Sequence, residues 1–534
     1  MITVHPQRAR PQDRIQSESQ KPVMQQVARF PSPIAGWVTN ENLASQRPDS
    51  AYVLDNFWVN RGSIAIRGGS QAHVDVAGDI VSLHNYSAGA EFYAADATAI
   101  YEFEATTANG TTLSPVVSGQ SSGAWISTET QNDAGSFLTL VNGDDDLQLY
   151  DGSTWYTVTL VSATHSITGS GLSGTDAFKY VWNYRNRVWF VQKESMNAWY
   201  LGVNSVSGAA TKFPLAGVFR KGGTLHSGAS FSLDSGDGPS NMVVFMSSQG
   251  EIAIYQGDPA IDFSLVGLYD VGVPLSTEPY VQIGGDLLIA TRAGLIPVTG
   301  AIQKSPAELK ITSVSLPIEP DWEYWSLLQP TGWKVAKWAE RGAAIFVVPD
   351  SYPPMAFVLN LETGAWSRWT NWDAAAVEVL GGQLYLANGD TAYIADTSGA
   401  DQGTAVTAKM CTAFHGLADG PSHKEAKRVR GSFRRDLSFN PQFSIGKDYT
   451  TDFPAIPTAA TLIAIDGAPI WDVAKWDETF WGIAGRAKGA KSQWHVVEGH
   501  GFALGVQLQI TSPTSVKLDT ELVAYDLTYT MGDT

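Results

Sequence analysis

A short alternating strand, a turn rich in glycine, aspartate or asparagine, and a second strand recur along the chain between residues 76 and 398. EFYAADATAIYEF, YVQIGGDLLIATRAGLIPV and YVWNYRNRVWFVQKESMNAWYL are examples. The units are spaced by roughly 40 to 50 residues, the period of four-stranded β-propeller blades, and about 320 residues at that period predict roughly seven blades. Amphipathic helical patterns are almost absent. We therefore predict an all-β fold built around a β-propeller.

The composition changes at both ends of the repeated region and divides the 534 residues into four parts. Residues 1–34 are polar, basic and proline-bearing, which predicts a flexible or partner-ordered arm. Residues 35–75 carry two apolar runs around the polar stretch at 60–63, which predicts a β-hairpin segment packing with the platform described next. After the propeller at 76–398, residues 399–534 begin with a small polar linker and end in alternating strands, which predicts a β-sandwich or platform domain.

Charge and cysteine content exclude several classes of protein. The formal net charge is −18, which argues against a protein that wraps nucleic acid by neutralising phosphates. Cys411 is the single cysteine, so an intrachain disulfide and a cysteine-based metal site are excluded, and a cytosolic origin is expected. The sequence has neither a signal-peptide pattern nor a run of about 18 apolar residues, so we expect no membrane-spanning segment.

One dense basic run breaks the acidic background. It can be a solvated strand edge that lysine and arginine protect against aggregation, or an electrostatic patch for an acidic neighbouring subunit. The sequence leaves both interpretations open. The basic residues, as a candidate subunit or adaptor interface, are Lys424, Lys427, Arg428, Arg430, Arg434 and Arg435.

Two short stretches predict the turns and core of individual blades. In NLETGAWSRW, Gly364 belongs to a strand-reversing turn, and Trp366 and Trp369 are three residues apart, so a regular strand would point them to opposite faces. We expect one in the inter-blade core and the other outward, where it could grip a ligand. LYDGSTW, with Asp151, Gly152 and Trp155, resembles the structural Asp-box hairpin of sialidase-type propellers, although that family's aspartate would fall at Tyr150.

Motifs that elsewhere carry chemistry lack their structural context here. The G-x-G-x-x-G match at 169–174 and the G-x-S-x-G match at 119–123 are not followed by a helix, so both predict polar loops. The aspartates at 144–146 could bind calcium, but a solvated turn is favoured because consecutive strand residues point to opposite faces. These motifs therefore identify no catalytic, cofactor or metal site, and a pair of carboxylates from distant parts of the sequence, suited to glycoside hydrolysis, stays open.

Several stretches, in this order, resemble a family of virion proteins from short-tailed, podovirus-type bacteriophages. They include VLDNFWVNRGSIAIRGG, GDGPSNMVVFMSSQGEIAIYQG, NLETGAWSRWTNWDA, HKEAKRVRGSFR and WDVAKWDETFWG. The resemblance implies a non-enzymatic tail nozzle or hub, assembled in the host cytoplasm into the virion tail as a homohexameric ring without a cofactor. It also implies contacts with the tail adaptor and portal, with tail fibres or spikes as further candidate partners. Genomic DNA would be retained by this ring and conducted through it during ejection, without sequence-specific binding.

Two rival hypotheses remain at this point. The 18 tryptophans also suit a receptor-binding, glycan-binding or glycan-hydrolysing propeller of a phage tail, because aromatic faces stack on sugar rings. A cytosolic scaffold propeller without a viral role is the third hypothesis.

Overall fold

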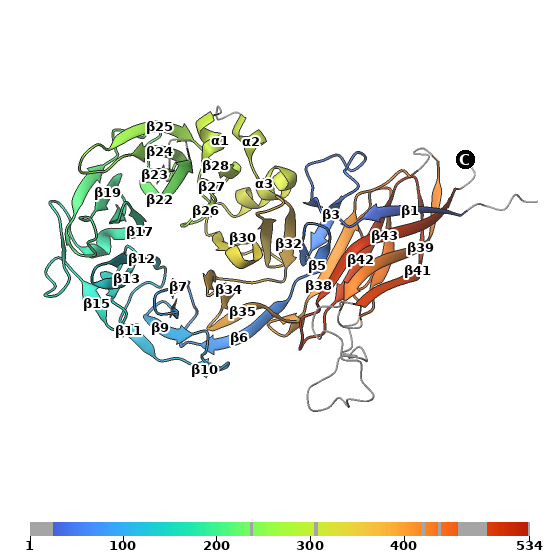
Figure 1. Ribbon diagram of the computed structural model, residues 1–534, viewed down its shortest axis with the longest axis horizontal. Coiled ribbons are helices and arrows are strands. Elements are labelled where there is room, and N and C mark those ends of the chain that lie inside the picture. The colour runs from blue at the N-terminus through green and yellow to red at the C-terminus, as the bar shows by residue number, and fades with distance from the viewer. Residues whose placement is uncertain are drawn as a thin grey trace, which may run out of the picture.

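Strands dominate the computed structural model, which describes residues 25–234, 239–303, 308–417, 422–435, 439–457 and 489–531. The predicted all-β fold is confirmed, since the helices in these ranges are few and short. Figure 1 shows a ring of sheets joined to a layered block, which we call the ring (residues 69–398) and the platform (residues 26–66 and 400–531). The helices and 3-10 turns are α1 (Val298–Gln303), α2 (Leu309–Thr312), α3 (Glu319–Leu328), η1 (Thr175–Ala177), η3 (Leu316–Ile318) and η4 (Ala339–Arg341).

Most of the ring consists of small antiparallel sheets whose strands follow one another in the sequence. The first two comprise β7 (Ser82–Tyr86), β8 (Glu91–Ala95), β9 (Ala99–Glu104) and β11 (Pro115–Ser118), then β12 (Ile126–Asn132), β13 (Gly135–Val141), β14 (Leu147–Tyr150) and β15 (Trp155–Val158). The next two comprise β17 (Phe178–Tyr184), β18 (Arg187–Gln192), β19 (Asn197–Tyr200) and β21 (Thr211–Pro214), then β22 (Leu225–Asp234), β23 (Pro239–Ser247), β24 (Glu251–Gln256) and β25 (Ser264–Asp270). A three-stranded sheet follows, with β26 (Tyr280–Ile283), β27 (Asp286–Thr291) and β28 (Gly294–Pro297).

Two further sheets complete the ring and tie it to distant segments. Strand β6 pairs with β35 although more than 300 residues separate them, so the start and the end of the ring share one sheet. These two sheets are formed by β29 (Lys334–Trp338), β30 (Ala343–Val348), β31 (Met355–Asn360) and β32 (Trp366–Thr370), and by β6 (Gly69–Asp75), β10 (Thr111–Thr112), β33 (Ala376–Leu380), β34 (Gln383–Asn388) and β35 (Thr391–Ser398). The ring therefore includes β6 from residue 69, inside the segment 35–75 that we expected to lie with the platform.

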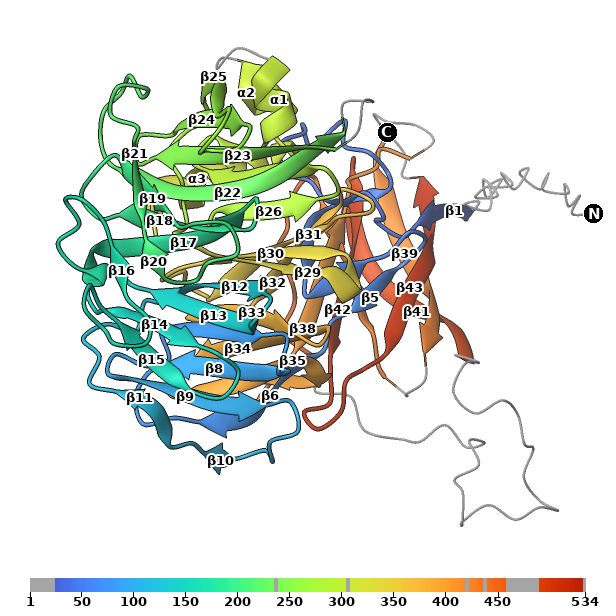
Figure 2. The same cartoon turned by 60° about the vertical axis from the view of Figure 1, so that its left-hand side comes forward.

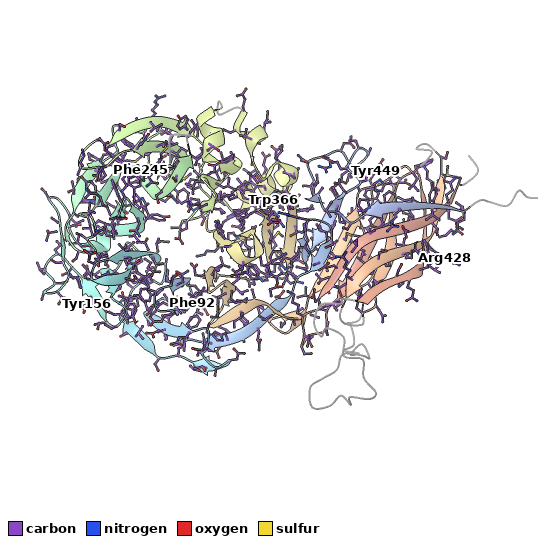
Figure 3. The ribbon with its side chains drawn as sticks, in the orientation of Figure 1. Phe92, Tyr156, Phe245, Trp366, Arg428 and Tyr449 are labelled. Atoms are coloured by element: carbon purple, nitrogen blue, oxygen red, sulfur yellow. The ribbon has the colours of Figure 1, made fainter. Side chains whose placement is uncertain are left out.

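The innermost strands close the ring. Strand β12 packs against β7 and β17, β17 against β22, and β22 against the β26–β27 hairpin. The hairpin packs against β29, β29 against β33, and β33 against β7 again. Between neighbouring sheets the core is aromatic: the Phe92 and Tyr385 rings, for example, lie 4.5 Å apart. Burying side chains of this size stabilises the fold by about 1.5–3 kcal/mol each. Figure 3 shows Phe92, Tyr156 and Phe245 at different places around this ring.

The platform consists of two facing sheets that mix the two ends of the chain. In the first, β43 pairs with β39, β5 and β1, and β39 pairs with β41. The second continues the ring sheet of β29 to β32 through β2, β3, β38, β42 and β40, so one nine-stranded sheet crosses the expected boundary at 399. The platform strands are β1 (Gln26–Pro31), β2 (Gly36–Trp37), β3 (Ser50–Asp55), β4 (Phe57–Val59), β5 (Ile64–Ile66), β38 (Thr407–Thr412), β39 (Lys424–Arg435), β40 (Gln442–Lys447), β41 (Gly489–Gly501), β42 (Leu504–Thr511) and β43 (Thr520–Met531). Two pairs of short strands remain: β16 (Ile167–Thr168) pairs with β20 (Gly208–Ala209) in the ring, and β36 (Ala400–Asp401) pairs with β37 (Thr404–Ala405) in the platform.

Two stretches singled out from the sequence lie wholly or partly outside the described residues. Residues 1–24 of the expected arm lie outside them, whereas Gln26–Pro31 of that arm form β1. The WDVAKWDETFWG stretch also lies outside them. The hairpin expected around 60–63 forms as β4 and β5, and it packs with the platform through β43. Within the described ranges, no helix has both the length and the apolar character needed to cross a membrane.

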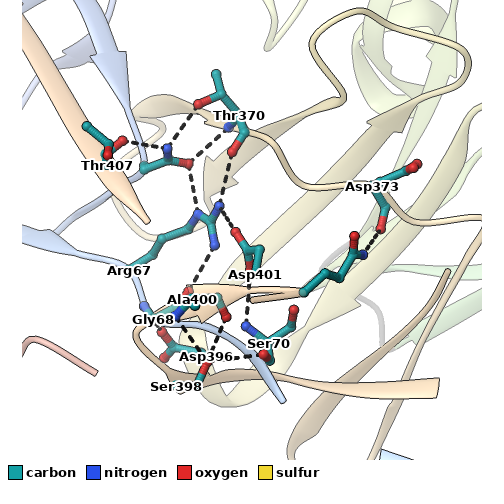
Figure 4. Close-up of polar contacts among 12 residues, drawn as sticks. Arg67, Gly68, Ser70, Thr370, Asp373, Asp396, Ser398, Ala400, Asp401 and Thr407 are labelled. Carbon is teal, nitrogen blue, oxygen red and sulfur yellow. Dashed lines mark hydrogen bonds and ion pairs between the residues drawn. The ribbon is translucent and has the colours of Figure 1, made fainter. Parts of the chain in front are cut away.

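A buried polar network holds the ring to the platform (Figure 4). The Arg67 side chain is 1% exposed and donates to Asp401 Oδ2 at 2.6 Å and to Asn56 Oδ1 at 2.9 Å. Asn56 Nδ2 in turn donates to Thr407 O of β38 at 2.8 Å. Asp396, at the end of the ring, accepts from Gly68 N at 2.6 Å. A buried arginine is tolerated here because its donors are met by a carboxylate and by carbonyl oxygens.

Candidate functional site

The predicted basic run forms β39. This strand lies in the interior of the platform sheet that contains β1, β5, β43, β39 and β41, which we call the outer platform sheet. Strand β43 flanks it on one side and β41 on the other. Figure 3 shows Arg428 on the side of the platform that is far from the ring. The interpretation of this run as the protection of an unpaired edge is therefore wrong for β39, because both of its edges are hydrogen-bonded.

Lys424 also departs from the expectation of a surface charge. It is 0% exposed, and its Nζ donates to Phe502 O at 3.1 Å. A lysine in this position hydrogen-bonds inside the platform and is not exposed to contact a neighbouring subunit. Lys427 is paired with Glu425, which shares its strand, at 2.5 Å. The side chain of Arg435 lies outside the described residues.

The remaining arginines lie on the outer face of the sheet in rows that cross several strands. Arg430 is level with Asp526 of β43 and Trp494 of β41; it donates to Asp526 Oδ2 at 2.6 and 2.9 Å, and its guanidinium lies 4.7 Å from the Trp494 ring centroid. Arg434 faces Glu521 at 4.0 Å. Arg428 is exposed and has no ion-pair partner among the described residues.

Further residues of this face were missed by the sequence reasoning. Arg29 of β1 is level with Asp526, and its side chain is 73% exposed. Val27 and Val496 are 62% and 76% exposed, and both are level with the Arg428–Thr528 pair. We call Val27, Arg29, Arg428, Arg430, Trp494 and Val496 the outer patch. Alternation of apolar and charged residues in KEAKRVRGSFRR could have indicated which arginines face outward, but the partners on β1 and β41 carry no such signal.

The predicted blade turn at Gly364 joins β31 to β32. Asn360 Oδ1 accepts hydrogen bonds from the amides of Glu362 and Thr363 at 2.8 and 3.0 Å, and Gly364 N donates to Asn360 O at 2.9 Å. Gly364 has a φ of +72°, a left-handed conformation that glycine adopts at little cost. The turn is thus held by its own backbone and by Asn360.

Both tryptophans after this turn are buried, so neither can grip a ligand. Trp366 is 0% exposed, lies in the core shared by ring and platform, and donates from Nε1 to Val314 O at 3.0 Å. Trp369 is 1% exposed and lies on the opposite face, in a cluster where its ring contacts Trp58 and Trp372 at 4.8 and 5.1 Å. The expectation that one would face outward is wrong, because β32 is covered on both faces.

The Asp151 turn is structural as well. Asp151 Oδ1 accepts from the amides of Ser153 and Thr154 at 2.9 and 2.8 Å. Gly152 has a φ of +89°, and the Trp155 ring stacks on Tyr150 at 5.0 Å. Burial acts to raise the pKa of the Asp151 carboxyl, but the hydrogen bonds it accepts outweigh this and hold the pKa below its usual value. This carboxylate closes the β14–β15 hairpin.

The G-x-S-x-G match at 119–123 is hydrogen-bonded to one of the three consecutive aspartates at 144–146. The Asp145 carboxylate accepts from Ser121 Oγ at 2.7 Å and from the amides of Ser121 and Ser122 at 2.9 and 3.1 Å. The serine of the G-x-S-x-G match is therefore fastened to one of the three consecutive aspartates. Among the described residues, no group of three or more His, Cys, Asp or Glu is placed to hold a metal ion.

Ionisable groups also lie on or beside the innermost strands of the ring. Glu378 of β33 accepts from Asn85 Nδ2 of β7 at 3.2 Å, and burial raises the pKa of its carboxyl to about 8. Desolvation by the surrounding protein raises the pKa of Glu278 to about 7, against the opposing charge of Lys334, although the Glu278 side chain is exposed to solvent. The His84 imidazole, buried on β7 and near the same lysine, has its pKa lowered to about 3. Glu378 on inner strand β33 and Glu278 just before β26 therefore both have pKa values raised toward or above neutral pH.

The tryptophans do not form a sugar-stacking surface in the described part of the chain. Of the fifteen tryptophans described, twelve are buried and three, Trp155, Trp325 and Trp494, are partly buried. Aromatic platforms for sugars need an exposed ring face. The tryptophan content therefore reflects the aromatic cores between sheets.

Comparisons with known proteins give no family. No protein-family model matches the chain, and neither does any curated protein. Among solved structures, Raptor from Chaetomium thermophilum is similar with a TM-score of 0.39 and 13% identity over 62% of this chain, which spans 30% of the Raptor chain. BBS1N in complex with ARL6DN is similar with TM-scores of 0.34 and 0.36 and identities of 9% and 10% in two structures, over 62% of this chain and 97% and 98% of theirs.

Proposed function

We propose that this chain is a structural protein of a short-tailed bacteriophage tail, a nozzle or hub that assembles as a homohexamer below the portal and adaptor. In this proposal the ring is a seven-bladed propeller, one blade for each sheet that contributes an inner strand, and the two facing sheets of the platform are a β-sandwich that holds the subunits together. The ring of subunits retains the packaged DNA and conducts it during ejection.

The outer patch is the observation that carries the proposal. Arginine and tryptophan are enriched at the centre of protein interfaces, and in the outer patch they lie beside the exposed Val27 and Val496. Arg428 lacks an ion-pair partner among the described residues, while the chain as a whole has a net charge of −18. A cationic, partly apolar patch on an acidic protein fits an acidic surface of another subunit.

The acidic charge also supports the role in DNA passage. A conduit must not hold the polyanion that slides through it, and clustered lysine and arginine would do so. A structural role needs no active site, and the motif residues Ser121, Asp145 and Asp151 are engaged in turns.

Mass photometry of the purified chain, alone and with a portal–adaptor complex, tests this proposal. We expect a six-subunit species, and we expect Arg428→Glu to weaken its formation at least tenfold. The matched control is Arg220→Glu, an exposed arginine on the ring, which should leave assembly unchanged. A chain that stays monomeric in both mixtures would overturn the proposal.

A glycan-binding propeller is the second candidate, and one cavity favours it. A cavity of about 500 Å³ at the ends of β12 and β17 is lined by Glu129, Asn132, Asp133, Asn183 and Asn204, amides and acids of the kind that bind sugar hydroxyls. No aromatic side chain lines it. A glycan array settles the choice: retention of one glycan class, lost in Asn183→Ala, would favour this candidate over the tail protein.

A further inference from the structure

At two opposite edges of the outer platform sheet, no further strand is paired among the described residues. Strand β1 pairs with β43 alone, and β41 pairs with β39 alone, among the residues that the structure describes. Neither strand makes another backbone hydrogen bond to a described residue. Figure 1 shows the order β1, β43, β39 and β41 across this sheet, and Figure 2 shows the same sheet on the side of the platform that lies away from the ring. Open edges of this length are templates for a further strand, and soluble proteins normally block them.

The directions of the strands make the two edges complementary. Each pair in the order β1, β43, β39, β41 is antiparallel. Because the number of strands is even, β1 and β41 run in opposite directions. A second copy placed beside the first in the same orientation therefore brings its β1 antiparallel to β41, which is the more stable way to continue a sheet.

We infer that β1 of one copy pairs with β41 of the next, so that the outer platform sheet runs continuously from subunit to subunit. This inference rests on the proposed ring, because it supplies a head-to-tail contact of the kind that closes a ring. It gives a partner to the members of the outer patch that lie on the two edge strands, Val27 and Arg29 of β1 and Trp494 and Val496 of β41: a second copy of this chain. Strand addition supplies the backbone hydrogen bonds, and the outward side chains of β1 and β41 supply the specificity.

Charge and shape support this pairing over the pairing of like edges. Arg29 stands exposed on β1, while β41 carries Trp494 and the exposed Glu498 on its outer side. A register that sets Val27 opposite Val496 places Arg29 against the Trp494 ring. A register four residues away sets Pro31 opposite Val496 and places Arg29 against Glu498. Arg29 already contacts Asp526 Oδ1 at 3.8 Å, and each register gives its guanidinium a second partner, whereas two paired β1 edges would bring the arginines of the two copies close together.

Cysteine cross-linking tests the pairing, since directly opposed residues of antiparallel strands come within disulfide distance. The native Cys411 is 0% exposed, and burial raises the pKa of its thiol to about 12, so it does not interfere. The test variants are Val27→Cys with Val496→Cys, for the first register, and Pro31→Cys with Val496→Cys, for the second. The matched control is Val27→Cys with Val161→Cys, whose second site is an exposed valine on the ring, 89% exposed in the wild-type chain.

We expect one of the two test pairs to give a ladder of covalent oligomers under oxidation that stops at the ring number, and the control pair to give none. A dimer from Val496→Cys alone would indicate a two-fold β41 contact and overturn the inference. Wild-type protein that assembles in mass photometry while neither pair cross-links also overturns the inference, but leaves the proposed function standing. Wild-type protein that never assembles overturns both.

Discussion

The ring and the platform are both made of strands, but they differ in how far apart in sequence their partners lie. In the ring, a strand usually pairs with the next strand of the chain, as β12 does with β13 across a short turn. In the platform, β1 pairs with β43 and β3 with β38, over hundreds of residues. The ring is thus locally encoded, whereas the platform exists only once both chain ends have met. The two regions should therefore respond differently to the same kind of substitution.

The largest effect is expected where the two regions share a core. Trp366→Ala removes a fully buried ring from the cluster that joins β32 to the platform strands and should cost about 4 kcal/mol. Hydrogen exchange should then increase in both regions. Trp494→Ala, on the outer face, is the control and should cost about 1 kcal/mol or less. Faster exchange in the ring alone would show that the regions fold independently.

The buried pair at the junction comes next. Arg67→Met leaves Asp401 buried without its cation and should destabilise the protein by about 3 kcal/mol. Platform strands should lose protection before ring strands, because the ring keeps its local hairpins. The control is Arg47→Met, which breaks the ion pair with Asp49, where the arginine side chain is 63% exposed. Chemical denaturation should show a loss in the free energy of unfolding of less than about 1 kcal/mol.

A pH effect should be confined to the ring. The raised pKa of Glu378, about 8, means that the folded state binds its proton more tightly than the unfolded chain does. Its stabilisation is complete below about pH 4.5 and is lost as the pH rises through about 8. Glu378→Gln should therefore gain stability over the wild type between pH 5 and 8, by up to about 1 kcal/mol per pH unit.

His84 does not obscure this comparison. Its pKa of about 3 destabilises the fold as the pH falls below 6.5, and it does so in both proteins, so it cancels in the difference. Glu362→Gln, on the exposed turn after β31, is the control, and its difference from the wild type should stay within about 0.5 kcal/mol at every pH. A flat profile for Glu378→Gln in denaturation at several pH values would contradict the raised pKa of this carboxyl.

The smallest effect is expected at a single turn of the ring, where it tests the local backbone conformation. Gly364→Ala should cost about 1 kcal/mol, since the added Cβ meets no atom within 4 Å but the φ of +72° is unfavourable for alanine. Gly62→Ala, in the platform hairpin, has equally open space without a positive φ, so the thermal midpoint should hardly move. Equal losses at the two sites would rule out backbone conformation as the cause.

The candidate site was only partly predictable. The basic run was visible, and Arg428, Arg430 and Arg434 lie on the outer face of β39. Lys424, however, is buried and donates to Phe502 O of the β41–β42 turn, a partner that the sequence does not indicate. Arg29, Trp494 and Val496 join the patch through β-pairing alone. Trp366 and Trp369 were placed on opposite faces correctly, yet their burial required knowing that the ring sheet continues into the platform.

The sequence by itself determined the strand-and-turn units of the ring, because alternation of side chains and left-handed glycines such as Gly364 act within a few residues. It also determined the acidic charge and the location of the basic run. Only the tertiary structure decided that β1 lies beside β43, that Arg67 meets Asp401, and which charges face outward. Pairing between segments hundreds of residues apart leaves no local pattern, since it is selected by the shape and burial of the assembled core.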